Sequence, residues 1–262
     1  MRCTILASGS KGNCSYIEGA NGAILVDAGL SARETLSRLE QAGRSPERIE
    51  AVIVTHEHGD HIKGLDVLSR KLDIPVFATE GTLADFLNSR RTSTKPIKTN
   101  TCRYDELFEI GDFKITPFAT SHDAAEPCGF LIAEDGARLG YCTDTGILSP
   151  HMLDLLRPCD GLVLESNHCP EMLANGPYPE SLKRRIRSRK GHLSNPAAAA
   201  ALRSLGKDAP PIILAHLSEI NNTPGKAFDS AREGLGLFFE EKNLTVATQD
   251  GSSAAAPQQI LL

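Results

Sequence analysis

The sequence predicts a layered α/β fold, in which helices cover the faces of β-sheets. Short apolar runs with strand character alternate along the chain with longer segments of helical periodicity. No linker rich in Pro, Gly or Ser divides the 262 residues, so we expect a single domain over 1–262. A hydrophobic content of 40% with 23% charged residues is typical of a chain with a sizeable core.

The first half of the chain is expected to contain more strands than helices. Turns rich in Gly, Asn and Ser, such as "SGSKGN" and "GANG", separate the first strands. Helices are expected over 31–42, with Ser31 as N-cap, and over 63–71 and 82–88. The strands expected in this half cover 4–7, 15–18, 23–26, 51–54, 75–78, 108–118, 129–133 and 138–142.

The second half alternates strands and helices more regularly. Strands are expected over 161–165, 212–215 and 245–248. The apolar tail from residue 252 onward is low in complexity and predicts an edge strand or a frayed end. The helices expected in this half cover 150–157, 196–205 and 226–239.

The bulk properties exclude several classes of protein. No apolar run approaches the ~18 residues that span a membrane, and the first residues are too short for a secretory signal. Seven scattered cysteines without a C-x-x-C pair predict reduced thiols and a cytoplasmic location. A net charge of −5 argues against a general polyanion binder, although a local patch can still be basic.

The stretch "THEHGDH" concentrates potential metal ligands directly after an apolar run. It places His56, His58 and His61 within six residues, with Asp60 beside the last. Imidazole nitrogen and carboxylate oxygen are ligands of zinc and similar ions. On an extended loop the first two rings point the same way, whereas Asp60 and His61 diverge and can serve a second ion. A polar surface loop is the alternative, but the rarity of the spacing favours a metal site.

Three further polar residues follow strand-like runs. His122 follows "KITPFATS", Asp144 follows "LGYCT", and His216 follows "IILA". Polar residues at strand ends are common, so each alone is more simply structural. Taken with the histidine cluster, and in this order, they are candidate metal ligands, because a metal site needs ligands on rigid support.

The order of these residues resembles the metallo-β-lactamase fold, whose motifs run Asp, H-x-H-x-D-H, His, Asp and His. Asp27 of "ILVDAG" matches the first motif, and the resemblance covers nearly the whole chain. It implies a four-layered αβ/βα sandwich with two divalent metal ions, Zn or Mn with Fe as a further alternative, between the sheets. Asp27 would orient ligating histidines. The ligands implied for the first ion are His56, His58, His122 and Asp144. Those implied for the second are Asp60, His61, Asp144 and His216.

Two other motifs bear on the substrate. "LESNH" places Glu165 at a strand end, and "KGHLSN" places His192 just before a helix. They resemble the phosphodiesterase branch of the fold, in which a histidine supported by a glutamate protonates the leaving oxygen. His192 capping the following helix is the alternative explanation. The same motifs, with "AHLSEINN", contribute Ser194, Asn195 and Ser218 as candidate substrate contacts.

A basic run, "SLKRRIRSRKGH", ends at His192. A charge run is usually a solvated helix face, but its position beside the candidate general acid favours contact with a nucleic-acid backbone. The candidate contacts are Lys183, Arg184, Arg185, Arg187 and Arg189, and Lys190 belongs to the same run.

The spacing excludes some relatives within the fold. Only 21 residues separate His122 from Asp144, too few for a long tRNA-binding arm, and 71 separate Asp144 from His216, too few for a β-CASP cap. The turn "ASGSKGN" and the motif "GHLSN" resemble the compact YycJ (WalJ) subfamily, which implies double-stranded DNA 5′→3′ exonuclease activity. The turn over 8–13 either approaches a phosphate through its backbone amides or is simply tight.

The functional hypothesis is therefore a binuclear-metal phosphodiesterase acting on nucleic acid, most simply DNA. By resemblance, a water bridging the metals attacks phosphorus, Asp60 orients or deprotonates it, and His192 protonates the leaving group with support from Glu165. The alternatives are a small-molecule, cyclic phosphodiesterase of PhnP type, a thioester hydrolase, and a non-catalytic metal-binding module. The oligomeric state stays open, with a dimer as one option.

Overall fold

Two mixed sheets pack face to face in the computed structural model, which describes residues 1–90, 95–205, 210–250, 252–253 and 256–262. Among these residues each sheet has seven strands. The first sheet runs, in spatial order, β16 (Gln259–Leu261), β1 (Arg2–Ala7), β2 (Cys14–Glu18), β3 (Ala23–Val26), β4 (Ile49–Ile53), β5 (Val76–Ala78) and β6 (Thr99–Thr101). The second runs β13 (Leu244–Val246), β12 (Ile212–Ala215), β11 (Gly161–Glu165), β10 (Ala137–Cys142), β9 (Cys128–Glu134), β8 (Phe113–Ala119) and β7 (Phe108–Ile110).

The two sheets share a pattern of strand directions. In the first sheet β16 to β3 pair antiparallel and β3 to β6 pair parallel. In the second, β7 to β10 pair antiparallel and β10 to β13 pair parallel. The carboxyl ends of the parallel strands in each sheet therefore lie at one edge, where α/β folds form their ligand sites.

Alternating residues of a strand belong to two different hydrophobic cores, one between the sheets and one between a sheet and its helices. Ile24 and Val26 of β3 pack between the sheets, against Phe113, Phe130 and other residues of the second sheet. Leu25, between them in the sequence, packs on the outer face with the helices. Because successive side chains in a strand point to opposite faces, a strand buried on both faces is apolar throughout.

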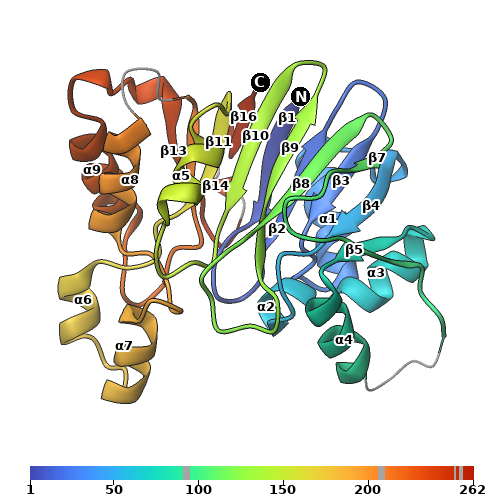
Figure 1. The fold of residues 1–262 in the computed structure, drawn as a ribbon, viewed down its shortest axis with the longest axis horizontal. Helices are drawn as coiled ribbons and strands as arrows, with labels where there is room; N and C mark the ends of the chain where they lie inside the picture. Colours follow the sequence, from blue (N-terminus) through green and yellow to red (C-terminus); the bar gives the residue numbers. More distant parts are fainter. Residues whose placement is uncertain (91–94, 206–209, 251, 254–255) are drawn as a thin grey trace.

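Helices cover both outer faces, which gives four layers (Figure 1). On the first sheet, Leu39, Leu68 and Phe86 from three helices pack into one cluster. On the second, Leu156, Leu202 and other helical residues form another. The helices on the first sheet are α1 (Ala32–Gln41), α3 (Leu65–Leu72) and α4 (Glu80–Ser89). Those on the second are α5 (Pro150–Leu156), α8 (Asn195–Leu205) and α9 (Pro224–Leu235). The predicted four-layered α/β sandwich is confirmed.

Most predicted elements are present, and Ser31 caps α1 by accepting a hydrogen bond from the amide of Glu34. The remaining described elements are short: α2 (Gly59–Ile62), α6 (Pro170–Asn175), α7 (Glu180–Arg187), η1 (Pro46–Arg48), η2 (Gly236–Phe238), η3 (Glu241–Asn243), β14 (Ser252–Ser253) and β15 (Ala256–Pro257). The α-helices in this list, α2, α6 and α7, were not predicted. The first two are too short for a hydrophobic period to develop, and α7 is mostly charged, with Leu182 and Ile186 as its apolar residues.

Of two predictions at element ends, one was imprecise and one agrees with the structure. The helix predicted over 226–239 ends at Leu235, because Gly236 adopts a positive φ of 57° that terminates it. The chain end forms β16, which pairs antiparallel with β1 and so agrees with the edge-strand alternative. No helix in the part of the chain that the structure describes has both the length and the apolar character needed to cross a membrane.

Candidate metal centre

Three candidate ligands, and the orienting residue Asp27, lie just beyond the ends of strands, and the other four ligands lie in the segment after β4. Asp27 follows β3, His122 follows β8, Asp144 follows β10 and His216 follows β12. Asp27, Asp144 and His216 have positive φ values of 62°, 55° and 57°. Such values are rare for residues other than glycine and cluster at functional sites, where the surrounding fold holds the strained backbone.

The loop after β4 brings the histidines of "THEHGDH" together. Ligand atoms of His56, His58 and His122 all lie within 4.8 Å of one another, and Nδ1 of His58 is 3.3 Å from Nε2 of His122. The second half of the motif is not the extended loop that we expected, because residues 59–62 form the helix α2. This turn of helix directs Asp60 and His61 to a second group.

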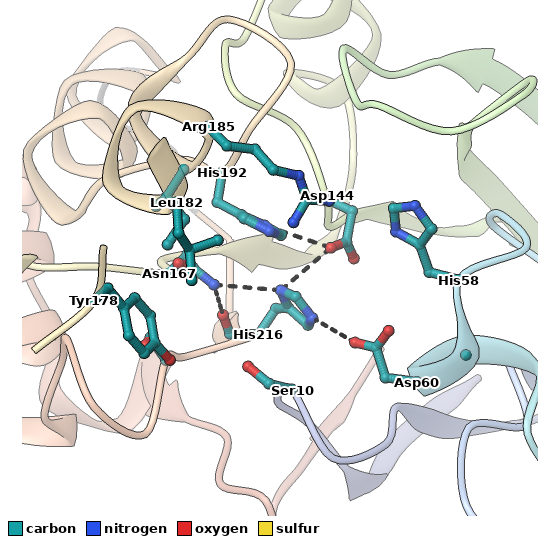
Figure 2. Close-up of a pocket in the computed structure, with 13 residues that line it drawn as sticks. Ser10, His58, Asp60, Asp144, Asn167, Tyr178, Leu182, Arg185, His192 and His216 are labelled. Atoms are coloured by element: carbon teal, nitrogen blue, oxygen red, sulfur yellow. Dashed lines mark hydrogen bonds and ion pairs between the residues drawn. The ribbon is translucent and has the colours of Figure 1, made fainter. Parts of the chain in front are cut away.

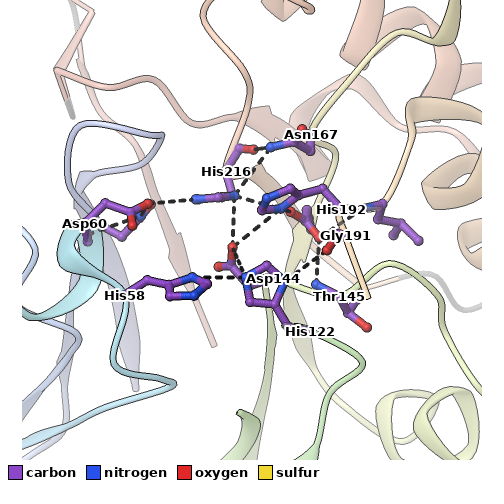
Figure 3. Close-up of polar contacts among 12 residues, drawn as sticks. His58, Asp60, His122, Asp144, Thr145, Asn167, Gly191, His192 and His216 are labelled. Atoms are coloured by element: carbon purple, nitrogen blue, oxygen red, sulfur yellow. Dashed lines mark hydrogen bonds and ion pairs between the residues drawn. The ribbon is translucent and has the colours of Figure 1, made fainter. Parts of the chain in front are cut away.

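Asp60, His61 and His216 form that second group of ligand atoms within 4.8 Å of one another. Oδ2 of Asp60 lies 3.4 Å from Nε2 of His216 and 3.5 Å from Nε2 of His61. Asp144 lies between the two groups: its Oδ2 is 3.4 Å from Nε2 of His61 and its Oδ1 is 3.9 Å from Nε2 of His122. The structure therefore places all seven predicted ligands at one site. Figure 3 labels His58, Asp60, His122, Asp144 and His216 among them.

The donor atoms at this site fit divalent metal ions. Nε2 of His56 and Oδ2 of Asp144 are buried and have no hydrogen-bond partner among the described residues. An unpaired buried polar atom costs free energy, so each requires a partner that the protein itself does not supply. Imidazole nitrogens with carboxylate oxygens are the ligand set of zinc, manganese and iron sites.

Electrostatics divides the histidines into two kinds. Burial lowers the pKa of His56, and neighbouring histidines lower it further, which leaves a neutral ring suited to a metal. Burial also lowers the pKa of His61, but Asp144 and Asp27 outweigh it and raise that pKa to about 9. Against the same effect of burial, Asp144 and Asp60 raise the pKa of His216. Metal binding at these two rings would therefore displace protons.

Residues behind the ligands orient them. Oδ2 of Asp27, which is fully buried, accepts a hydrogen bond from Nδ1 of His61 at 2.8 Å, so Nε2 of that ring faces the site. The amide of Thr55 donates to Oδ1 of Asp27. The hydroxyl of Thr55 also lies 3.0 Å from Nδ1 of His56. This position of Asp27 agrees with the predicted orienting role, which remains a proposal.

The turn over 8–13 contacts the same centre. Nδ2 of Asn13 lies 3.1 Å from Nε2 of His61 and 3.3 Å from Oδ2 of Asp60. The hydroxyl of Ser8 accepts a hydrogen bond from the amide of His216. Both contacts join segments far apart in the sequence, so a local pattern could not reveal them. The turn thus contacts three candidate ligands, His61, Asp60 and His216. Its Ser10 lines the adjacent pocket.

Glu165 and His192 form a hydrogen-bonded pair beside this centre. Oε1 of Glu165 is 2.7 Å from Nδ1 of His192 and 3.2 Å from Nδ1 of His216. Glu165 is completely buried, yet its pKa is lowered, because His192 and His216 outweigh the effect of burial. With Nδ1 of His192 turned to the carboxylate, Nε2 is the ring nitrogen left for proton transfer.

The loop that carries His192 needs a glycine for close packing. A Cβ atom on Gly191 would lie 2.2 Å from the carbonyl oxygens of Arg185 and Ile186. The carbonyl of Gly191 also lies 3.0 Å from Nδ1 of His122, which joins this loop to the candidate ligands. The close backbone packing of Gly191 in "GHLSN" thus fixes the position of the next residue, His192.

A pocket of about 370 Å³ opens over these groups (Figure 2). Asp60, Asp144, His192 and His216 lie on its wall. Among the predicted substrate contacts, Arg185 and Ser218 line it as well. Ser10, from the turn over 8–13, lines it too, and the lining residues not predicted as site residues are Gly59, Asn167, Tyr178, Leu182 and Ile186. Asn167 follows β11 and could have been identified as a polar strand-end residue, whereas Tyr178 carried no signal of that kind.

Two predicted substrate contacts are corrected by the structure. Lys183 is buried, and its Nζ donates to the carbonyl of Ala174 at 2.7 Å, which pins α7 to the end of α6. Asn195 is buried, and its amide exchanges hydrogen bonds with Asn222 and accepts one from Ser166. Neither side chain is free to contact a substrate.

The remaining predicted contacts lie at the surface. Ser194 caps α8 by accepting a hydrogen bond from the amide of Ala197, a role that the sequence had offered to His192 as an alternative. Arg187 pairs with Glu180 on the solvent side of α7. Arg184 and Arg189 are exposed, so contact of these two with nucleic acid remains a proposal. Arg185 alone of the predicted basic contacts lines the pocket described above.

A family model described as a beta-lactamase superfamily domain matches residues 23–217. The chain is 39% identical over 247 residues to a Bacillus anthracis protein named exodeoxyribonuclease YycJ, with 93% of this chain and 90% of that protein aligned. It is 41% identical over 226 residues to exodeoxyribonuclease WalJ of Streptococcus pneumoniae, with 84% and 82% aligned. The chain belongs to the YycJ/WalJ group of the metallo-β-lactamase superfamily.

Structural similarity agrees with that membership of the superfamily. The metallo-β-lactamase fold protein YhfI from Bacillus subtilis superposes with a TM-score of 0.72 at 18% identity, covering 95% of this chain and 97% of that one. At such identity the likeness shows the fold alone. Superfamily membership and the histidine–aspartate cluster together establish a hydrolase that depends on divalent metal ions.

Proposed function

We propose that the chain is a phosphodiesterase that acts on nucleic acid, most simply a double-stranded DNA 5′→3′ exonuclease. The Glu165–His192 pair carries the proposal, because it places a proton donor beside the candidate metal ligands. An alkoxide leaves a phosphodiester poorly without a proton, and a positioned general acid contributes typically ~10²–10⁴-fold. The two relatives named exodeoxyribonucleases support DNA as the substrate.

The chain's own residues would divide the reaction among them. Asp60, partly exposed at the pocket wall, would accept a hydrogen bond from the attacking water and orient it. As the new oxygen–phosphorus bond forms and the scissile one breaks, His192 would transfer a proton from Nε2 to the departing oxygen. Glu165 would hold the ring throughout. Two divalent ions, zinc or manganese, would activate the water and offset charge on the phosphate when bound by these ligands.

A comparison of substrates tests this proposal. We expect Mn²⁺-loaded protein to shorten 3′-labelled duplex DNA stepwise from its 5′ end and to release a labelled mononucleotide from 5′-labelled duplex. A chelator should stop both reactions. RNA of the same sequence and a chromogenic phosphodiester are the comparison substrates, each followed by gel or absorbance. Hydrolysis of the small phosphodiester without any degradation of nucleic acid would favour a PhnP-type activity and contradict the proposal. Hydrolysis of a thioester alone would contradict phosphodiester chemistry altogether.

Arg185 is the expected backbone contact in the basic run. Its guanidinium lies over the pocket in Figure 2 and donates to both carboxylate oxygens of Asp123, with Nη2 at 3.0 Å. Because this pair is exposed, it contributes little stability, roughly 0–1 kcal/mol, and the guanidinium can turn to a phosphate. We expect Arg185→Gln to weaken DNA binding and reduce the slope of log affinity against log salt by about 1. Fluorescence anisotropy across a salt series measures both quantities.

Arg184 provides the matched control. It lies one residue away on α7, is exposed, and does not line the pocket. Arg184→Gln removes the same charge from the same helix without changing the pocket, so it should weaken DNA binding less than Arg185→Gln does. Equal salt slopes for the two variants would show that Arg185 has no particular role at the site.

A further inference from the structure

One wall of the pocket comes from α7 and from the connection between α6 and α7, through residues to which no role is assigned above. Tyr178, Leu182 and Ile186 form this wall, beside Asn167 and Ser218. Tyr178 is the one aromatic side chain other than histidine among the described lining residues. Figure 2 shows its ring on the Asn167 side of the pocket, across from Asp60. The pocket therefore combines a catalytic wall of charged groups with an apolar, aromatic one.

The backbone at Tyr178 is restrained. It lies between Pro177 and Pro179, and a residue that precedes proline is restricted to extended conformations. The adjoining Gly176 packs so closely that an added Cβ would lie 2.6 Å from Oδ1 of Asn221. Asn221 is itself buried in the loop after His216 and accepts a hydrogen bond from the amide of Cys169 at the start of α6. The backbone that carries the ring is thus restrained relative to the metal centre.

The ring has an unused binding face. Tyr178 is half-buried, and its hydroxyl has no hydrogen-bond partner among the residues that the structure describes. The ring of Tyr178 makes no contact with another described aromatic side chain. By contrast, the rings of His192 and His216 in the same pocket contact each other, with their centroids 5.2 Å apart. A preorganised aromatic face in a pocket with hydroxyl and amide groups suits a planar heterocycle such as a nucleobase, because bases stack on aromatic rings whatever their sequence.

The oxygen that receives the His192 proton indicates which nucleotide of the substrate would lie in this pocket. His192 lines the same pocket, so the oxygen that it protonates belongs to the part of the substrate held in that pocket. Water adds its oxygen to phosphorus, the bond from phosphorus to O3′ breaks, and the His192 proton passes to O3′. The nucleoside that leaves with a free 3′ hydroxyl is the one on the 5′ side of the cut. In a 5′→3′ exonuclease, that is the terminal nucleotide of the strand.

We propose that this pocket is the binding site for the 5′-terminal nucleotide, with its base stacked on Tyr178 and its O3′ toward His192. The inference rests on the proposed nuclease function and deepens it by assigning the group that selects a strand end. Tyr178 is then a binding residue for a nucleobase, and a phosphate or sugar alone does not engage it. The wall formed by Tyr178, Leu182 and Ile186 would also leave no room for a further nucleotide on the 5′ side of the terminal one.

Calorimetric titration of Mn²⁺-loaded protein tests the inference without relying on turnover. The probes are deoxyadenosine 5′-monophosphate, which carries a base, and 2-deoxyribose 5-phosphate, which does not. We expect Tyr178→Ala to weaken binding of the nucleotide about 5- to 100-fold and to leave binding of the sugar phosphate unchanged. Tyr178→Phe, which keeps the ring, should bind both probes as the unmodified protein does. Leu237→Ala, at a fully exposed position outside the pocket, is the control for surface truncation.

The outcomes separate this inference from the proposed function. If Tyr178→Ala binds the nucleotide unchanged, or loses affinity for both probes equally, the base site is wrong even when the protein still degrades DNA. If the unmodified protein binds neither probe, the base site is wrong as well. If the nucleotide binds in a Tyr178-dependent manner but the protein degrades no nucleic acid, the proposed nuclease function fails while a nucleotide site stands.

Discussion

Asp144→Asn will reduce hydrolysis by about 10³-fold or more and lower the amount of metal bound, because a metal centre commonly supplies several kcal/mol. Asp144 lies between the two ligand groups, within 3.3–3.9 Å of ring nitrogens on His61, His122 and His216. Asparagine tolerates the positive φ of this position, so the substitution removes the charge without forcing the backbone. Metal content by elemental analysis and initial rates on DNA measure the two effects.

Asp135→Asn is the matched control for Asp144→Asn. Asp135 is exposed in the turn after β9 and has a φ of 48°, close to that of Asp144, but it lies far from the candidate ligands in the sheet. Its substitution changes the same charge in the same backbone conformation and should leave metal content and rate unaltered. A full metal complement with a nearly normal rate in Asp144→Asn would contradict the metal centre described above.

His192→Ala will reduce cleavage of DNA by about 10²–10⁴-fold, the usual contribution of a general acid. The same variant should lose far less activity toward a nitrophenyl phosphodiester, because the nitrophenolate ion departs without needing a proton. The hydrogen bond to Glu165 at 2.7 Å motivates the prediction, since it leaves Nε2 as the only ring nitrogen available to the substrate. Steady-state rates on both substrates under one set of metal conditions measure the difference.

His151→Ala controls for the loss of a histidine at the surface. His151 lies on α5, is exposed, and does not line the pocket over the metal centre. Both substrates should be hydrolysed at unaltered rates by this variant. Equal losses on DNA and on the nitrophenyl ester in His192→Ala would assign that histidine to binding or positioning and contradict proton transfer to the leaving oxygen.

The fold class followed from local patterns that survive in the tertiary structure. The apolar runs that predicted strands, such as 23–26 and 161–165, match β3 and β11 residue for residue. Both strands are buried on their two faces, so their sequences are apolar except for Glu165 at the end of β11. The helices α6 and α7 escaped prediction. α6 has only six residues, and α7 is mostly charged, with Leu182 and Ile186 as its apolar residues, so neither shows a clear hydrophobic period.

The candidate ligands were predictable for a similar reason. Four of the seven lie within one short motif, and the others follow strands whose ends meet at one edge of the sandwich. Their supporting contacts were not all predictable. Asn13 reaches His61 across 48 positions, and Glu165 serves both His192 and His216, 27 and 51 positions away. Only the pairing of distant strands brings such residues together.

The sequence by itself determined the layered α/β fold and the set of candidate metal ligands, because both depend on residue type and short-range spacing. Only the tertiary structure decided which side chains face the pocket. In the basic run it turned Arg185 toward the site, buried Lys183 and left Arg184 in solvent, according to the angle at which α7 packs. It also directed Tyr178 at the metal centre. The direction of a side chain on a short helix or loop depends on what that element packs against, and this is a property of the whole fold.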